Sequence, residues 1–450
     1  MSELDLTRRN FVGAAAVAGA GMLLAGCSTK KSVAPTKFLD EAPDGEVIKA
    51  GLVGCGGRGT GAVQNFLRAG KNLEIVALAD LFQDKLDTCR RRFEGRPEAK
   101  LTDETCFVGF DAYQKLLQVP GLNYVILATP PYFRPQMFEA AVEANKNVFM
   151  EKPVAVDPVG ARQIMASGEK AKAYKLSVVA GTQRRHQRQY IETYNHVKNG
   201  AIGEIVAARA YWCQGQLWYK EPQKDWSQME AMIRDWVNWC WLSGDHIVEQ
   251  HVHNIDVCNW FVGAFPVKAS GFGARMRRVT GDQYDFFAVD FTYDNGVHMA
   301  SYCRQIDGCW NSVSEYVEGT EGSTDCKGTI YDKKGNVVWQ YQEEDPKEPG
   351  KKMEPERSAM DPYVQEHIDL VTAIRTGQPI NEAETVAKSV LTAIMGRISA
   401  YTGPETTWDQ MMSSDLKLGP AELVMGPVPG ITAQVPIPGT SKEGTSTSQE

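Results

Sequence analysis

The sequence lacks several patterns that would place it in common protein classes. It has no CxxC pair, no HExxH motif, and no run of about 20 apolar residues that could span a membrane. No stripe of Lys and Arg appears, and the formal net charge is −8. These absences argue against a zinc site, a polytopic membrane protein and a nucleic-acid partner.

The first 26 residues are predicted to be an export signal rather than part of the fold. Thr7-Arg8-Arg9-Asn10-Phe11 leads into a Gly- and Ala-rich apolar run that ends at Leu24-Ala25-Gly26-Cys27. A twin-arginine motif, a short apolar run and a lipobox cysteine stand in the order of a lipoprotein signal. We expect export, lipidation at Cys27 and membrane attachment only through that lipid; an uncleaved anchor helix is the alternative.

The cysteine count does not suggest a disulfide framework. Of 10 cysteines, nine remain after Cys27, which is an odd number. Free buried thiols fit a protein that folds in the reducing cytoplasm before transport, and the twin-arginine route carries folded proteins.

A polar linker over residues 27–46 precedes a dinucleotide-binding pattern over residues 47–185. The apolar strand Val47–Val53 runs into Gly54-Cys55-Gly56-Gly57-Arg58-Gly59, a GxGxxG sequence, and a helical pattern and a second apolar strand ending at Asp80 follow. Strand, glycine loop, helix, strand and acid in this order predict a Rossmann unit, whereas a glycine turn without nucleotide is the alternative.

Each residue type in this pattern has a physical purpose. Gly54 allows a tight turn, Gly56 lets the backbone approach a pyrophosphate, and Gly59 permits close packing of helix on strand. The carboxylate of Asp80 would accept hydrogen bonds from the adenosine ribose and repel a 2′-phosphate, so NAD is favoured over NADP. The predicted cofactor residues here are Gly54, Gly56, Gly57, Arg58, Gly59 and Asp80.

Helical and strand patterns continue to alternate, which predicts an α/β fold with a doubly wound parallel sheet. The predicted strands 124–128 and 147–150 are followed by Thr129-Pro130-Pro131 and Glu151-Lys152-Pro153. Ligands bind at the carboxyl ends of strands in such sheets, so both loops are candidate site elements.

The GxGxxG loop, the Thr-Pro-Pro turn and Glu-Lys-Pro, in this order and spacing, resemble the Gfo/Idh/MocA family, which includes glucose-fructose oxidoreductase and inositol dehydrogenase. The resemblance spans about Val47 to Tyr401. It implies an NAD(P)-dependent oxidoreductase that transfers hydride at a carbinol carbon of a sugar or sugar derivative. It also implies that Lys152 lies beside nicotinamide and substrate, where a cation can bind the carbinol oxygen. Without the flanking motif, Lys152 would be an ordinary loop lysine. Further implied cofactor residues are Thr129, Pro130, Glu151 and Lys152.

Relatives in this family place an aspartate four residues before a histidine in a helix that faces the nicotinamide. Alignment on residues 252–256 makes His253 that histidine and replaces the aspartate by Glu249. His253 would take the hydroxyl proton, with Glu249 orienting it or acting as a second base. On one continuous helix over 244–256, His246 would share their face, while His251 would lie in the core. The trio could bind a metal, but we expect none.

Substrate-side groups are expected after the predicted strand 176–180, which ends on the same rim as the Glu-Lys-Pro loop. Arg185, His186 and Tyr190 are our candidates, with a solvated helix start as the alternative, and His246 is a further candidate from the predicted helix over 244–256. Six of the 10 tryptophans lie between positions 212 and 241. Trp236 is the candidate for stacking on a sugar ring, although core packing explains most of this group. Arg134 stands where many relatives have histidine, and it would pair with cofactor phosphate or be solvated.

Residues 186–401 are expected to form an α+β substrate domain with an open, mostly antiparallel sheet. Alternating strand patterns occur around 205–211, 285–293, 297–303 and 313–318. In the family this sheet face commonly mediates dimer or tetramer contacts. Helices within 360–401 are expected to pack back on the dinucleotide domain, and residues 420–450, rich in Pro, Gly, Ser and Thr, to form a loose tail.

The export signal and the cofactor loop together predict a tightly bound cofactor, because free NAD is scarce outside the cytoplasm. The reaction would then have to return the bound cofactor to its starting oxidation state in each turnover. Hydride passes from one sugar to another, or a sugar is oxidised transiently, loses its glycosidic substituent by elimination and is reduced again. NAD-dependent glycosidases of the N-acetylgalactosaminidase type resemble the second case. A sugar-binding lipoprotein without turnover is a third hypothesis.

Overall fold

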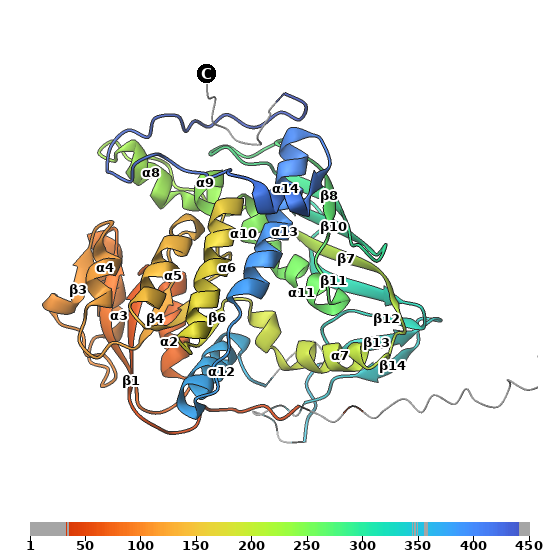
Figure 1. Ribbon diagram of the computed structural model, residues 1–450, viewed down its shortest axis with the longest axis horizontal. Coiled ribbons are helices and arrows are strands. Elements are labelled where there is room, and N and C mark those ends of the chain that lie inside the picture. The colour runs from red at the N-terminus through yellow and green to blue at the C-terminus, as the bar shows by residue number, and fades with distance from the viewer. Residues whose placement is uncertain are drawn as a thin grey trace, which may run out of the picture.

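The structure contains two β-sheets, one in each half of the chain (Figure 1). The computed structural model describes residues 33, 36–343, 345, 348, 350–354 and 359–440. The predicted signal peptide at 1–26 and the predicted lipidation site Cys27 lie outside these residues. Within the described part of the chain, no helix is long and apolar enough to cross a membrane.

The first sheet is parallel and six-stranded, in the order β3-β2-β1-β4-β5-β6. The strand order reverses between β1 and β4, and the carboxyl ends at such a reversal form the usual ligand crevice. The predicted Rossmann sheet is therefore confirmed. Its strands are β1 Ile48–Val53, β2 Leu73–Asp80, β3 Cys106–Val108, β4 Tyr124–Leu127, β5 Asn147–Met150 and β6 Val178–Ala180.

Helices cover both faces of this sheet, so its central strands are buried and read as apolar runs. Along β4, Tyr124 and Ile126 belong to a core with α2, α3 and α12, whereas Val125 and Leu127 belong to a core with α4, α5 and α6. Helix α13, Ala383–Thr402, packs between α6 and the second sheet. The other helices are α2 Gly57–Leu67, α3 Gln83–Phe93, α4 Ala112–Leu117, α5 Arg134–Glu143, α6 Pro158–Ala173, α7 Arg188–Lys198 and α12 Pro362–Thr376.

The second sheet has nine strands in the order β14-β13-β12-β11-β7-β10-β9-β8-β15. All neighbours are antiparallel except β10 and β7, so the expectation of an open, mostly antiparallel sheet is confirmed. Helices α11 and α13 cover one face. The strands are β7 Ile205–Gln214, β8 Lys268–Ala274, β9 Phe286–Thr292, β10 His298–Gln305, β11 Ser312–Gly319, β12 Gly322–Thr324, β13 Thr329–Asp332, β14 Val337–Gln340 and β15 Thr406–Thr407.

The predicted continuous helix over 244–256 is two helices, α10 His246–Glu249 and α11 Val252–Val262. At the break, His251 N donates to the carbonyl of His246 at 3.1 Å, a wider turn than an α-helix makes. The expectation that His246, Glu249 and His253 share one regular helical face is therefore wrong. The relative positions of these side chains depend on the break between α10 and α11 and do not follow from regular helical spacing.

The predicted loose tail over 420–450 is wrong for residues 420–440. Residues 420–440 lack helix and strand, but Val428 and Ile431 are buried and Tyr284 donates a hydrogen bond to Pro436 O at 2.9 Å. Scattered apolar residues anchor this segment despite its Pro- and Gly-rich composition. Residues 441–450 lie outside the described part. The described residues also form three short α-helices, α8 Gln228–Arg234, α9 Cys240–Ser243 and α14 Trp408–Ser413, and the 3₁₀-helices η1 Asp103–Thr105, η2 Pro131–Phe133, η3 Gln183–His186 and η4 Trp236–Asn238.

Candidate active site

The glycine loop between β1 and α2 has the geometry of a phosphate cradle. Gly54 has a φ of +98°, and a Cβ there would lie 2.6 Å from the Ala128 backbone. A Cβ at Gly59 would lie 1.9 Å from Gly54 O, so only glycine fits. A Cβ at Gly56 or Gly57 would meet nothing within 4 Å, and both residues line a groove. The loop therefore presents bare backbone, at the start of a helix, to whatever fills the groove.

The carboxylate of Asp80, at the end of β2, is held by hydrogen bonds from two backbone N–H groups. Its Oδ2 accepts a hydrogen bond from Cys55 N at 2.6 Å, and its Oδ1 accepts one from Phe82 N at 2.9 Å. Burial raises the pKa of Asp80, although these two donors oppose the rise. A carboxylate has about four acceptor positions, so it can still accept hydrogen bonds from a ribose.

The groove has a volume of about 820 Å³, within the usual range for a small-molecule or cofactor site. Gly56, Asp80, Thr129 and Pro130 line it from the parallel-sheet domain, so the residues present fit a dinucleotide. Trp236 lines the same groove, and its ring lies 6.3 Å from that of Trp218. The structure thus places Trp236 in the cofactor groove, whereas the sequence predicted a sugar-stacking position.

Lys152 and Glu249 form a buried ion pair at the carboxyl end of β5. Lys152 Nζ donates to the Glu249 carbonyl at 2.6 Å and lies 3.1 Å from Glu249 Oε1. The side chains are only 12% and 7% exposed. Glu249 Oε2 has no hydrogen-bond partner among the described residues. The pair therefore keeps a buried acceptor available to a ligand.

His253 lies close to this pair, stacked on Trp212 with ring centroids 5.6 Å apart and planes 19° apart. Burial, together with the charges of Lys152 and Arg184, holds the pKa of His253 well below its ordinary value. The imidazole is therefore neutral near pH 7. In the part of the chain that the structure describes, its Nδ1 has no hydrogen-bond partner. The three predicted catalytic residues are thus brought to one place.

Arg134 has a role that the sequence did not reveal. Its buried guanidinium donates to the carbonyls of Thr129 and Pro153, which belong to the two loops after β4 and β5. Burial lowers the pKa of Arg134 to about 10, against the opposing charges of Glu151 and Glu249. Arg134 therefore positions the Glu-Lys-Pro loop instead of contacting solvent.

Glu151 and Arg58 connect the Glu-Lys-Pro loop to the glycine loop. The Arg58 guanidinium pairs with Glu151 Oε1 and lies 4.7 Å from the centroid of the Tyr363 ring on α12. Arg58 therefore makes its closest contacts with protein groups. This ion pair joins the glycine loop to the loop that carries Lys152.

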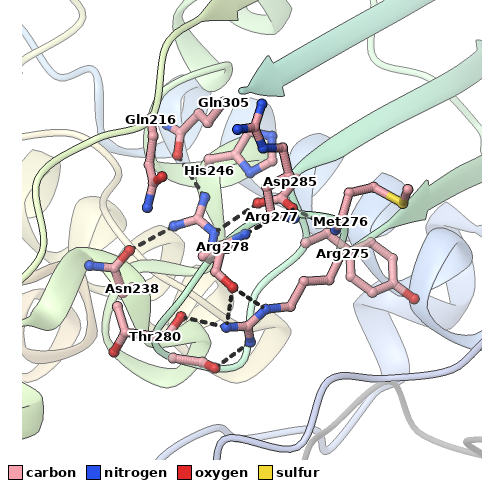
Figure 2. A network of polar contacts seen from close by, with 12 residues as sticks. Gln216, Asn238, His246, Arg275, Met276, Arg277, Arg278, Thr280, Asp285 and Gln305 are labelled. Carbon is pink, nitrogen blue, oxygen red and sulfur yellow. Dashed lines mark hydrogen bonds and ion pairs between the residues drawn. The ribbon is translucent and has the colours of Figure 1, made fainter. Parts of the chain in front are cut away.

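His246 belongs to a buried polar cluster that includes Asp245 and Arg278. Its Nδ1 lies 2.9 Å from Asp245 Oδ1. Figure 2 shows His246 beside Arg278, which donates to Asn238 Oδ1 and to Gln305 Oε1, both at 2.7 Å. Sequence reasoning missed this cluster, because its members come from separate loops and strands without a common motif.

Arg185 and His186 are engaged with protein carboxylates. Arg185 makes a two-pronged ion pair with Asp256, with distances of 2.7 and 2.9 Å. His186 lies between Asp369 and Glu382, at 2.6 and 3.1 Å. Burial opposes protonation of His186, but the two carboxylates outweigh it and raise its pKa well above the ordinary value. Substrate contact by either residue stays a prediction that this geometry does not favour.

Tyr190 is equally engaged, and its neighbour Arg184 is nearer to the catalytic residues. Tyr190 Oη donates to Glu315 Oε2 at 3.1 Å, and Arg184 pairs with the other oxygen of the same carboxylate. The Arg184 guanidinium lies 5.7 Å from the Trp212 ring, on which His253 stacks. Sequence reasoning did not select Arg184, because only the position of β11 shows its partner.

Two domains of one family match the chain. The model described as "Oxidoreductase family, NAD-binding Rossmann fold" matches residues 48–180, and the "GFO/IDH/MocA C-terminal domain" matches residues 190–325. The chain belongs to the Gfo/Idh/MocA oxidoreductase family. Among the described residues of this family member, no group of three or more His, Cys, Asp or Glu side chains could hold a metal ion.

Curated relatives carry two kinds of name. A "Glycosyl hydrolase family 109 protein" of Shewanella baltica is 26% identical over 226 residues, which are 48% of this chain and 47% of that protein. An "Inositol 2-dehydrogenase" of Salmonella paratyphi B is 25% identical over 217 residues, 48% of this chain and 54% of that protein. The chain thus spans about half the length of the curated relatives it matches.

Solved structures agree on the fold. The crystal structure of GenD2 from gentamicin A biosynthesis in complex with NAD has a TM-score of 0.62 at 17% identity. The alignment covers 83% of this chain and 99% of that one. At this identity the likeness establishes the two-domain architecture and nothing finer.

Proposed function

We propose that the protein is an NAD-dependent oxidoreductase that transfers hydride at a hydroxyl-bearing carbon of a sugar or sugar derivative. The observation that carries the proposal is the convergence of Lys152, Glu249 and His253 at the strand ends that also hold the dinucleotide groove. Two chain segments that are far apart in sequence, one with Lys152 and one with Glu249 and His253, supply a cation, a carboxylate and a neutral imidazole. A sugar-binding protein without turnover would not require this set.

The cofactor supplies the capacity to accept a hydride from a carbinol carbon. Lys152 has three N–H donors and uses two on Glu249, which leaves one for the carbinol oxygen. This hydrogen bond stabilises negative charge as it develops on that oxygen. Neutral His253 accepts the hydroxyl proton, and because its pKa is low it holds that proton weakly. Glu249, with Oε2 free of described partners, is the second base.

Asp80 supports NAD over NADP, because a carboxylate at the end of β2 repels a 2′-phosphate. We propose that the cofactor stays bound through turnover and that the protein acts outside the cytoplasm, attached through lipid at Cys27. The twin-arginine motif and lipobox support this location. A dissociable NADH would be lost there after one turnover, so retention and location support each other.

The glycosidase cycle is the second candidate, favoured by the relatives named glycosyl hydrolase family 109 proteins. Elimination needs one group to remove the proton next to the transient ketone and another to protonate the leaving oxygen. Glu249 and His253 provide two such groups on one side of the site. Lys152 would then hold the keto oxygen throughout the cycle.

We also propose a homo-oligomer, a dimer or tetramer, built on the open face of the second sheet. That face carries large exposed apolar and aromatic side chains, which a monomer rarely leaves in water. They include Phe272, Tyr302, Trp310 and Tyr316.

The test uses purified mature protein without added cofactor. Bound nucleotide is released by denaturation and identified, and absorbance of reduced nicotinamide is followed while simple sugars and aryl glycosides are added. Stoichiometric NAD with sugar-dependent reduction supports the oxidoreductase. Glycoside cleavage without net NADH supports the second candidate. Absence of nucleotide, with no binding of added NAD, would overturn both.

A further inference from the structure

The cofactor groove has a second wall that comes from outside the Rossmann domain. Besides Asp80 and Phe82, its lining includes Trp218, Arg234 and Trp236, from the segment that connects β7 to α9. Helix α8 lies within this segment, and Figure 1 shows it above α4 and α5. A plain Rossmann crevice is open to solvent on this side, so the segment encloses what the crevice holds.

Arg234 attaches this wall to the residues that follow the ribose-binding carboxylate. Its guanidinium donates to both oxygens of Asp84, at 2.8 and 3.1 Å. It also lies 3.9 Å from the centroid of the Phe82 ring. The hydrogen bonds from Arg234 lower the pKa of Asp84, which keeps the pair ionised. Asp84 and Phe82 stand four and two residues after Asp80, at the adenosine end of the groove.

The C-terminal segment supports α8 from behind. Met229 N donates to Gly426 O at 3.0 Å, and Val428 N donates to Gln228 Oε1 at 2.8 Å. Leu423 reaches the groove itself. The wall is therefore held at two sides, by Arg234 toward the Rossmann domain and by the backbone of residues 426–428 away from it.

We propose that the segment from Trp218 to Trp236 is a cofactor clamp, in which Arg234 holds the adenosine end of the dinucleotide site closed. The inference rests on the proposed function and deepens it, because it names the element that retains the cofactor. To leave, a dinucleotide must displace the clamp, so the contacts of Arg234 with Asp84 and Phe82 slow its release. Arg234 is a positioning residue here, not a catalytic one.

The experiment measures NADH release from the loaded mature protein, by the loss of NADH fluorescence after excess NAD is added. A partly exposed ion pair and a cation–π contact contribute modestly, so Arg234→Ala should speed release about tenfold. Asp84→Asn should act in the same direction from the other side. The double variant should release NADH no faster than Arg234→Ala, because both changes remove the same contact.

The matched control is Arg90→Ala. Arg90 lies on the same helix as Asp84, but its ion pair is with Asp103, which does not line the groove. Its release rate should equal that of the unmodified protein. Unchanged release in both Arg234→Ala and Asp84→Asn overturns the clamp while leaving the proposed function intact. If the unmodified protein binds no dinucleotide, the clamp and the proposed function fall together.

Discussion

Two buried ion pairs lie on the rim of the site, and they differ in whether every carboxylate oxygen has a hydrogen-bond partner. Arg185 and Asp256 satisfy each other through two hydrogen bonds, and Ser389 Oγ donates a third to Asp256. Lys152 and Glu249 are buried as well, but Glu249 Oε2 lacks a partner within the described chain. A buried polar atom without a partner costs free energy, so a ligand that donates a hydrogen bond to Glu249 Oε2 would recover that cost.

Removing the Lys152 cation should have the largest effect on activity. Lys152→Met keeps the length of the side chain but loses the hydrogen bond to the carbinol oxygen, so we expect kcat to fall by about 10² to 10³. The midpoint of thermal unfolding should fall as well, because the Glu249 carboxylate is left buried without its cation. Steady-state kinetics measure the change in kcat, and thermal unfolding measures the change in stability. Full activity in Lys152→Met would show that the incomplete pair is structural.

Breaking the complete pair should lower stability without a comparable loss of kcat. Arg185→Met leaves the Asp256 carboxylate buried without its cation, and such changes destabilise proteins by about 3 to 5 kcal/mol. We expect the free energy of unfolding to fall accordingly, while kcat per folded molecule stays within a few-fold of the original. Denaturant titration and kinetics on the same preparation measure the two effects. A large loss of kcat with unchanged stability would return Arg185 to the substrate site.

Asp80 extends the comparison to a carboxylate that has protein donors and is still expected to bind a ligand. Two backbone N–H groups occupy only part of its acceptor capacity. Asp80→Ser removes the charge that repels a 2′-phosphate, so the ratio of NADP to NAD affinity should rise by about tenfold or more. Nucleotide titrations of protein freed of cofactor provide the measurement. An unchanged ratio would remove Asp80 from cofactor discrimination.

The same contrast explains which parts could be predicted from the sequence. Gly54, Asp80 and Lys152 sit in short motifs at strand ends, where neighbours in sequence are also neighbours in space. The partner of Arg184 is Glu315, whose position depends on how β11 pairs with β7. Arg134 binds two backbone carbonyls, for which no side-chain pattern exists.

The local backbone geometry around Asp245 and His251 also could not be predicted from the sequence. Asp245 has a φ of +69°, and its side chain accepts a hydrogen bond from His246 N at the start of α10. This cap fixes a short helix, and the wide turn at His251 then separates it from α11. Helical periodicity alone reads the stretch as continuous, because a single wide turn hardly disturbs the pattern.

Two histidines provide the smallest and most specific test. His186 has carboxylate partners, as Arg185 does, whereas His253 Nδ1 has no partner among the described residues, as is the case for Glu249 Oε2. His186, between two carboxylates, has a raised pKa, so the folded state binds its proton more tightly than the unfolded chain does. Its stabilisation is fully present below the unfolded value near 6.5 and is lost as pH rises through the raised pKa. The stability deficit of His186→Gln should therefore be largest at acidic pH and shrink toward alkaline pH.

His253 should show the opposite sign. Its pKa is lowered, so below about pH 6.5 the unfolded chain binds the proton that the folded state refuses, and acid destabilises the fold. His253→Asn removes this penalty and should lose less stability than the unmodified protein as pH falls from 7 to 5. Urea titrations across pH measure both variants. If His253→Asn and the unmodified protein gave parallel pH profiles, His253 would not be held neutral in the folded state. It could then not be the neutral proton acceptor beside the Lys152–Glu249 ion pair.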